Sequence, residues 1–180
     1  MLAEAFRGPA LARPVNVKSV SKTLVAGVMG AAVDRGVAMP QSTLGATVPE
    51  LIPYDADPRV AGLSLADLVS LRAGLEPTSG PNYGAWVSSP NWVAYALSRP
   101  FVADPGTRMI YSTGSFHVLG ATLASVTDRS LLALTRDWIG DPLGIEVPAW
   151  SRDPQGFYLG GNEMALSPWA MTAFGEMTRR

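Results

Sequence analysis

The segment SVSKTLVAGVMGAAV, residues 19–33, constrains the fold more than any other part of the sequence. It is apolar on nearly every side from Thr23 to Val33, and Gly36 is placed to end a helix just beyond it. A helix without a polar face is stable only when other elements cover it. We therefore expect a buried central helix, whose glycines and alanines let its neighbours approach closely.

Capping residues and apolar spacing predict further helices around it. Ser64 is a candidate N-cap for a helix that ends at Gly74, and Ser167-Pro168 supplies an N-cap and a first-turn proline for the last helix. Convincing strands are few. The other predicted helices cover 91–98, 115–126 and 130–139, with a loop over 37–62 and a short strand over 2–6.

Composition excludes several classes of function. The chain has 14 basic and 15 acidic residues without a basic patch, so nucleic-acid binding is not expected. No run of 18 apolar residues is present, and the start MLAEAFRGPA lacks the pattern of a signal peptide, which leaves the compartment open. The absence of cysteine excludes disulfides and thiolate metal sites.

Histidine-based and metal-based hydrolysis are poorly supported. The one histidine, His117, lies among apolar residues of a predicted helix, where a packing role is the better interpretation. No Gly-x-Ser-x-Gly segment supplies a partner nucleophile, and one histidine with scattered carboxylates makes no metal-ligand cluster. We expect neither a cofactor nor a metal.

Ser19 and Lys22 form an S-x-x-K pair that suits serine–lysine chemistry. Residues three apart on a helix share a face, so the Lys22 amine can reach the Ser19 hydroxyl. The apolar sequence that follows implies burial, which would lower the pKa of Lys22 and make the amine a base. The alternative is an N-cap serine beside a solvated lysine, which is the commoner meaning of this short pattern alone.

Tyr111, in Tyr111-Ser112-Thr113, adds a third candidate group. Its phenol could share proton transfer with the lysine and deliver a proton to a leaving group. In isolation, a half-buried tyrosine that packs through its ring is the simpler interpretation. Tyr111 is a candidate catalytic residue because it occurs in combination with Ser19 and Lys22.

Together these segments resemble the serine β-lactamase, DD-peptidase and esterase superfamily, and most of all its class C-like esterases and amide hydrolases. The resemblance runs in order over roughly residues 14–178. It implies Ser19 as the acylated nucleophile with its N–H in the oxyanion hole, Lys22 as general base and Tyr111 as proton-transfer partner. The matching segments are VKSVSKTLVAGVMGAAVDRG, SLADLVSLRAGL, DPGTRMIYSTGSFHVLGATL, DPLGI and LGGNEMALSPWAMTAFGEM.

The resemblance also implies a substrate cleft near Asn82, Tyr83 and Trp86, with Thr113 as a further substrate contact. The family commonly has asparagine where Thr113 stands, and threonine lacks the donors and carbonyl of a carboxamide. The family's early strands and its late strand with a Lys/His-x-Gly-type motif have no counterpart. We therefore expect an α+β, β-lactamase/DD-peptidase-like fold, truncated at both ends, in which one partial domain over 1–180 keeps mainly the helical part and lacks much of the antiparallel sheet.

The leading hypothesis is a serine hydrolase that cleaves a small-molecule ester or amide, a β-lactam included. Thr113 favours an esterase or general amidase. The alternative is a catalytically silent fragment that acts as a binding module, with a partner chain or a second copy over its exposed apolar face. A helical domain unrelated to hydrolases is a third interpretation, which five motifs in order disfavour.

Overall fold

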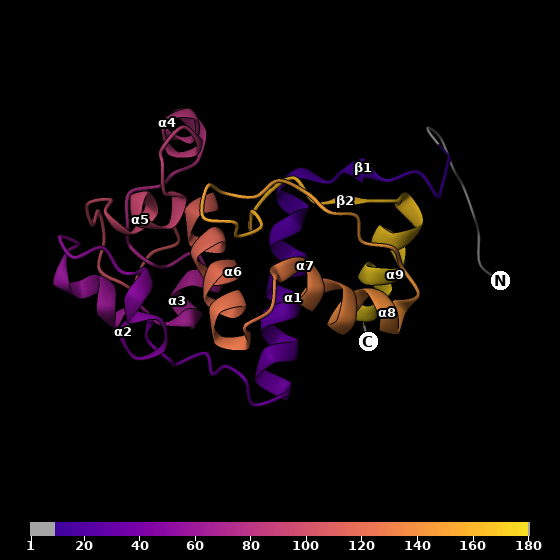
Figure 1. Cartoon of the computed structure of the whole chain (residues 1–180), viewed down its shortest axis with the longest axis horizontal. Helices are drawn as coiled ribbons and strands as arrows, with labels where there is room; N and C mark the ends of the chain where they lie inside the picture. Colours follow the sequence, from indigo (N-terminus) through magenta and orange to yellow (C-terminus); the bar gives the residue numbers. More distant parts are fainter. Residues whose placement is uncertain (1–9, 180) are drawn as a thin grey trace.

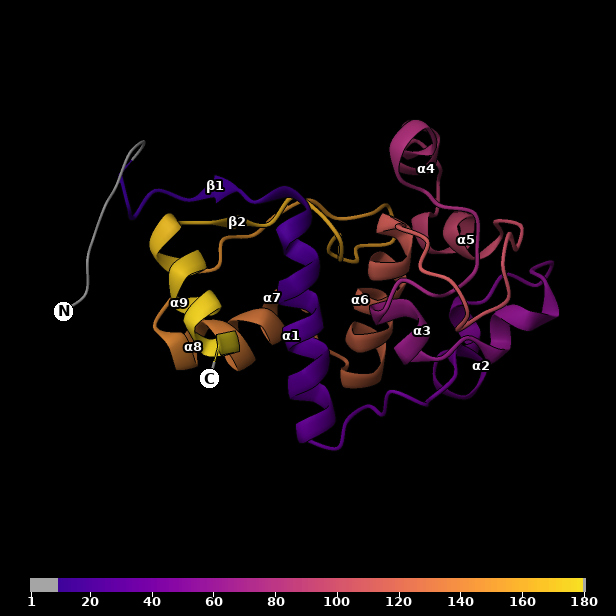
Figure 2. The same ribbon diagram turned by 180° about the vertical axis from the view of Figure 1, so that it is seen from behind.

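The computed structural model describes residues 10–179. Two long helices, α1 (Ser21–Asp34) and α6 (Thr113–Thr127), stand side by side at its centre (Figure 1). The shorter helices lie in two groups on either side of this pair, as the reverse view also shows (Figure 2). Beyond α1 lie α7 (Leu131–Thr135), α8 (Asp141–Leu143) and α9 (Pro168–Arg179); beyond α6 lie α2 (Leu44–Thr47), α3 (Leu65–Val69), α4 (Tyr83–Val87) and α5 (Trp92–Leu97).

A single two-stranded sheet is present within residues 10–179. Strand β1 (Val15–Asn16) pairs antiparallel with β2 (Ala165–Leu166), with Val15 opposite Leu166. After β1 the chain makes one tight helical turn, Lys18–Val20, and enters α1, so the sheet lies at that end of the helix (Figure 1). The expected α+β fold with mainly helices and little sheet is confirmed, while the strand predicted over 2–6 lies outside the described residues.

Helix α1 is buried on most of its circumference but not on all of it. The buried face includes Leu24, Val25 and Val28, whereas Thr23 and Val33 are exposed. The prediction of a buried central helix is confirmed except for one stripe of exposed residues, which no described element covers. Its end agrees with expectation: Gly36 has φ +67°, and two backbone bonds around it close the last turn.

Helix α6 is the more deeply buried of the central pair. Residues 113–123 are all buried, and side chains such as Leu119 and Leu123 are fully enclosed. Both α1 and the short helices α3 and α5 contact it, so α6 joins the two groups of helices into one core.

Several predicted helix ends need correction. The helix capped by Ser64 ends at Val69 rather than at Gly74, because Leu71 adopts a left-handed conformation (φ +59°). The segment predicted as helix over 130–139 is α7 only to Thr135 and continues as a wider turn over Arg136–Gly140. The predicted loop 37–62 contains the short helix α2.

The predicted N-caps are present. Ser64 makes a reciprocal capping box with Asp67, and Ser167 Oγ accepts from the Ala170 N–H. At α5 the Asn91 side chain accepts from the Ala94 N–H, and at α7 the Ser130 side chain accepts from the Ala133 N–H. No helix within residues 10–179 is long and apolar enough to cross a membrane.

Candidate active site

Ser19 lies in a tight helical turn, Lys18–Val20, that precedes α1, and not within the first turn of α1 itself. Lys18 has φ +50°, a conformation that costs a non-glycine residue free energy and tends to occur where surrounding contacts enforce it. Its N–H donates to Asn16 Oδ1 at 2.8 Å. The turn presents the Ser19 side chain at the surface.

Ser21 fastens this turn to the segment that enters β2. Its buried hydroxyl donates to the Lys18 carbonyl at 2.6 Å and accepts from the Met164 N–H at 3.1 Å. The Val17 N–H in turn donates to the Met164 carbonyl at 2.9 Å. The segment around Met164, far along the chain, therefore fixes the turn that carries Ser19.

Lys22 is the buried centre of the site, with a residue exposure of 6%. Its Nζ lies 3.2 Å from Ser19 Oγ, 3.2 Å from Thr113 Oγ1 and 2.7 Å from the Gly161 carbonyl oxygen. The prediction that Lys22 reaches Ser19 is confirmed. The interpretation of Lys22 as a solvated lysine is wrong, because the helices and the 161 segment enclose it.

Burial lowers the pKa of Lys22 from its ordinary value, because an ammonium loses hydration inside the protein. A hydrogen bond with Tyr111 and the charge of its phenolate form oppose this shift without cancelling it. The lysine therefore gives up its proton more readily than an exposed lysine does, as a general base requires.

Tyr111 lies beside this pair, at the end of the loop that leads into α6. Lys22 Nζ is 4.7 Å from the centre of its ring, and the residue is 44% exposed. Burial raises the pKa of the phenol, but hydrogen bonds with Ser19 and Lys22 and the lysine charge outweigh it, so the net pKa is lowered. The three residues singled out in the sequence thus come together.

Thr113 begins α6 and joins Lys22 to a second hydroxyl. Its Oγ1 lies 2.9 Å from Ser79 Oγ, and its N–H donates to the same oxygen at 2.8 Å. The Gly114 N–H donates to Thr78 Oγ1 at 2.8 Å. The free N–H groups at the start of α6 are thus capped from the 78–79 segment, which fixes Thr113 beside Lys22.

The remaining predicted substrate residues are placed differently from one another. The Tyr83 hydroxyl accepts from Asn162 Nδ2 at 3.3 Å, which brings it next to the Gly161 segment. Asn82 turns its amide to the Pro77 carbonyl at 2.9 Å, within its own loop. Trp86 is fully buried.

His117 is a satisfied core histidine, as its sequence context indicated. Its side chain is fully buried and its Nε2 lies 3.0 Å from Asp153 Oδ2. No bond within the described residues links it to Ser19 or Lys22. Within residues 10–179, no three His, Cys, Asp or Glu side chains are arranged to hold a metal ion.

Sequence reasoning missed three contributors to the site: Gly161, Ser79 and Ser21. Gly161 contributes a backbone carbonyl, which no side-chain motif marks. The one signal that could have pointed to it is the pair Gly160-Gly161, since glycines permit a close approach of backbone. Ser79 could be found only from the path of its loop. Ser21 stands inside the S-x-x-K segment, where its spacing drew attention to its neighbours instead.

The contacts of Lys22 define what the site can do. A neutral amine has two N–H donors and one lone pair. Thr113 Oγ1 and the Gly161 carbonyl can take both donors, and this leaves the lone pair for the Ser19 hydroxyl. The arrangement is therefore suited to remove a proton from Ser19.

Comparisons with known proteins identify the family and the fold of the chain. The model of the Beta-lactamase family matches residues 14–162. Among solved structures, EstCE1, a hydrolase with promiscuous acyltransferase activity, superposes with a TM-score of 0.75 at 18% identity over 94% of this chain and 60% of its own. A D-stereospecific amidohydrolase from Streptomyces sp. gives 0.71 at 18% identity, over 91% and 60%.

A beta-lactamase/D-alanine carboxypeptidase from Yersinia pestis, solved with citrate, gives a TM-score of 0.71 at 19% identity, over 93% of this chain and 54% of its own. The chain thus spans between about half and three fifths of the length of these proteins. At these identities the superpositions establish the fold. The search of curated proteins found no significant match.

Proposed function

Because the chain belongs to the Beta-lactamase family, we propose that it is a serine hydrolase that cleaves an ester or amide bond through an acyl-enzyme on Ser19. The observation that carries this proposal is the setting of Lys22. Its amine is buried and its pKa is lowered. Thr113 Oγ1 and the Gly161 carbonyl can accept its two N–H groups, so the lone pair of the neutral amine is left for the Ser19 hydroxyl.

In the acylation step, Lys22 takes the hydroxyl proton as Ser19 Oγ bonds to the substrate carbonyl carbon. The Ser19 N–H donates to the oxygen that becomes negative. Tyr111 passes a proton from Lys22 to the leaving oxygen or nitrogen as its bond to carbon breaks. A water molecule then attacks the acyl carbon and gives a proton to Lys22. The bond between that carbon and Ser19 Oγ breaks, Oγ takes the proton back from Lys22, and the carboxylic acid leaves.

The substrate we propose is a small ester or a linear amide. The names of the structural neighbours include a hydrolase with acyltransferase activity and an amidohydrolase, which supports this range. The family commonly has asparagine at the position of Thr113. A threonine hydroxyl offers a substrate amide fewer hydrogen-bond donors and acceptors than that carboxamide would, which favours esters. Asn82 and Tyr83, at the start of α4, belong to the segment that we assign to the substrate side of the site.

The proposal is tested by turnover of p-nitrophenyl butyrate, an acyl p-nitroanilide and a chromogenic cephalosporin. Ester hydrolysis with an initial burst is expected, together with its loss in Ser19→Ala and Lys22→Ala. Ser70→Ala is the matched control, because Ser70 is exposed and only donates to the Ala66 carbonyl. Hydrolysis that survives in Ser19→Ala or Lys22→Ala, or its absence in the folded wild type, would overturn the proposal.

A further inference from the structure

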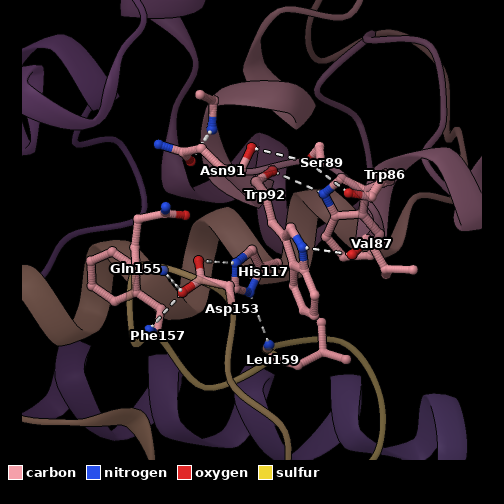
Figure 3. Close-up of polar contacts among 12 residues, drawn as sticks. Trp86, Val87, Ser89, Asn91, Trp92, His117, Asp153, Gln155, Phe157 and Leu159 are labelled. Atoms are coloured by element: carbon pink, nitrogen blue, oxygen red, sulfur yellow. Dashed lines mark hydrogen bonds and ion pairs between the residues drawn. The ribbon is translucent and has the colours of Figure 1, made fainter.

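The proposed mechanism leaves one buried ionisable pair unused. His117, on α6, and Asp153, in the loop that follows α8, have fully buried side chains with Nε2 and Oδ2 3.0 Å apart (Figure 3). Burying two such groups is costly unless they are paired and hydrogen-bonded. The hydrogen bonds of the pair show which parts of the structure it stabilises.

Two tryptophans enclose the imidazole. The ring centres of Trp86 and Trp92 lie 5.8 Å and 5.6 Å from that of His117, both edge-on. Each indole N–H donates to a backbone carbonyl instead, Trp86 to Trp92 and Trp92 to Val87 (Figure 3). Within residues 10–179, the side-chain hydrogen bonds of His117 therefore run only to the loop 153–160.

Asp153 organises that loop with its other oxygen. Its Oδ1 accepts from the N–H groups of Gln155, at 2.9 Å, and Phe157, at 2.8 Å. The turn closes with the Gly156 N–H donating to the Asp153 carbonyl at 3.0 Å. One oxygen of the carboxylate thus shapes the turn while the other ties it to α6.

The second imidazole nitrogen meets the backbone near the site. The Gly160 N–H donates to His117 Nδ1 over a long bond of 3.4 Å. Because a backbone N–H can only donate, Nδ1 is the acceptor and the ring proton is on Nε2, where it faces Asp153. The carboxylate therefore sets the tautomer that can hold Gly160.

The two glycines that follow lie directly on α6. A Cβ at Gly160 would stand 2.1 Å from the Phe116 carbonyl oxygen, and one at Gly161 would stand 2.8 Å from Thr113 Cγ2. This close approach brings the Gly161 carbonyl to 2.7 Å from Lys22 Nζ. One peptide unit thus separates the atom held by His117 from the atom that contacts the lysine.

We propose that the His117–Asp153 pair is a positioning device, which fixes the Gly160–Gly161 segment so that the Gly161 carbonyl orients the Lys22 amine toward Ser19. Both residues act through the backbone and touch no substrate. The catalytic meaning of this inference rests on the proposed hydrolase function, but the structural link from Asp153 to Lys22 can be measured without any substrate.

Asp153→Asn tests the link with almost no change in shape. The carboxamide oxygen stays with the two N–H groups of the turn, because the opposite orientation would place its NH₂ against both donors. The NH₂ then faces His117 Nε2, and the ring proton must move to Nδ1. There it opposes the Gly160 N–H, so the hydrogen bond to Gly160 is lost.

Two NMR measurements read the result. The chain has one histidine, so its imidazole ¹⁵N signals are unambiguous, and the proton is expected to move from Nε2 to Nδ1. It has two lysines, Lys18 and Lys22, so ¹³Cε signals follow each amine, with exposed Lys18 as internal reference. The Lys22 titration midpoint is expected to fall further, because its ammonium loses a carbonyl acceptor, while that of Lys18 stays.

The labelling rate of Ser19 by a fluorophosphonate is expected to fall by about 100-fold, as for a misplaced catalytic group. Thr135→Val is the control, since it removes a buried hydrogen bond to the Leu131 carbonyl away from the loop. It should move neither the tautomer nor the Lys22 midpoint. If Asp153→Asn does not fold, His117→Gln makes the same break from the other side, because it keeps an N–H donor for Asp153 and loses the imidazole Nδ1 that accepts from Gly160; in this variant the Lys22 midpoint and the labelling rate are the readings.

A folded variant with an unchanged tautomer, or with a Lys22 midpoint that stays or rises, would overturn the inference. Wild type that takes no label at Ser19 would instead overturn the proposed function, and the two NMR readings would still decide the positioning role.

Discussion

Lys22 Nζ lies 3.2 Å from Ser19 Oγ, although the two residues stand on opposite sides of a change in helix type. Ser19 is in the tight turn before α1, and Lys22 is in the first turn of α1. Two residues distant in sequence also fix the Lys22 amine, since it donates to Thr113 Oγ1 and to the carbonyl of Gly161. The short motif supplies the reacting groups, and the distant residues fix their orientation.

Tyr111 sets the pH dependence together with burial. Because Lys22 must be neutral to act as a base, the rate at which Ser19 is labelled is expected to rise with pH and level off below pH 10.5, the ordinary pKa of lysine. Tyr111 opposes the lowered pKa of Lys22, so Tyr111→Phe is expected to move the rise to lower pH and to slow labelling by about 100-fold. Stopped-time labelling across pH measures both, and a rise at higher pH in Tyr111→Phe would contradict this assignment.

Thr113 is expected to act through its hydroxyl. Thr113→Val removes the acceptor for one Lys22 N–H and the partner of Ser79, and we expect ester turnover to fall by about 100-fold. Thr113→Ser keeps the oxygen and is expected to stay within severalfold of wild type, on the order of 1 kcal/mol in barrier. Equal turnover in the two variants would contradict this role of the hydroxyl, and lower turnover in Thr113→Ser than in Thr113→Val would assign the effect to the methyl group instead.

Ser21 is expected to stabilise the turn that carries Ser19. Ser21→Ala leaves the Met164 N–H without its acceptor, and an unsatisfied buried donor costs about 1–3 kcal/mol. Urea unfolding followed by circular dichroism measures the loss. The exposed control Ser70→Ala should change the free energy of unfolding by about 0.5 kcal/mol or less, and equal values for the two variants would contradict the role of Ser21.

Gly160 is expected to tolerate no side chain. A Cβ there would stand 2.1 Å from a backbone oxygen of α6, and such overpacking costs about 3 kcal/mol or more. At Gly84, an exposed position of α4, a Cβ would meet nothing within 4 Å, so Gly84→Ala is expected to be neutral or to stabilise by up to ~1 kcal/mol. Thermal unfolding of both variants gives the comparison, and a Gly160→Ala protein as stable as Gly84→Ala would contradict the close approach.

Local rules predicted much of this chain. Ser64, Asn91, Ser130 and Ser167 all begin helices because a side-chain oxygen accepts an N–H that the helix leaves free. The three-residue spacing of Ser19 and Lys22 predicted their contact for an equally local reason, since one helical turn brings them together.

The rest depended on tertiary contacts that sequence spacing does not reveal. The Gly161 carbonyl reaches Lys22 across 139 positions, along a path that Asp153 and His117 help to set. The exposed stripe of α1, with Thr23 and Val33, likewise could not be predicted, because the apolar sequence of a helix does not reveal which other elements pack against each of its faces.

Whether Ser19 is an activated nucleophile is tested most directly by intact-mass spectrometry after incubation with a fluorophosphonate. One probe-sized mass gain is expected in wild type, mapped to the peptide that contains Ser19, and none in Ser19→Ala. Folded wild type without that gain, or the same gain in Ser19→Ala, would contradict this expectation.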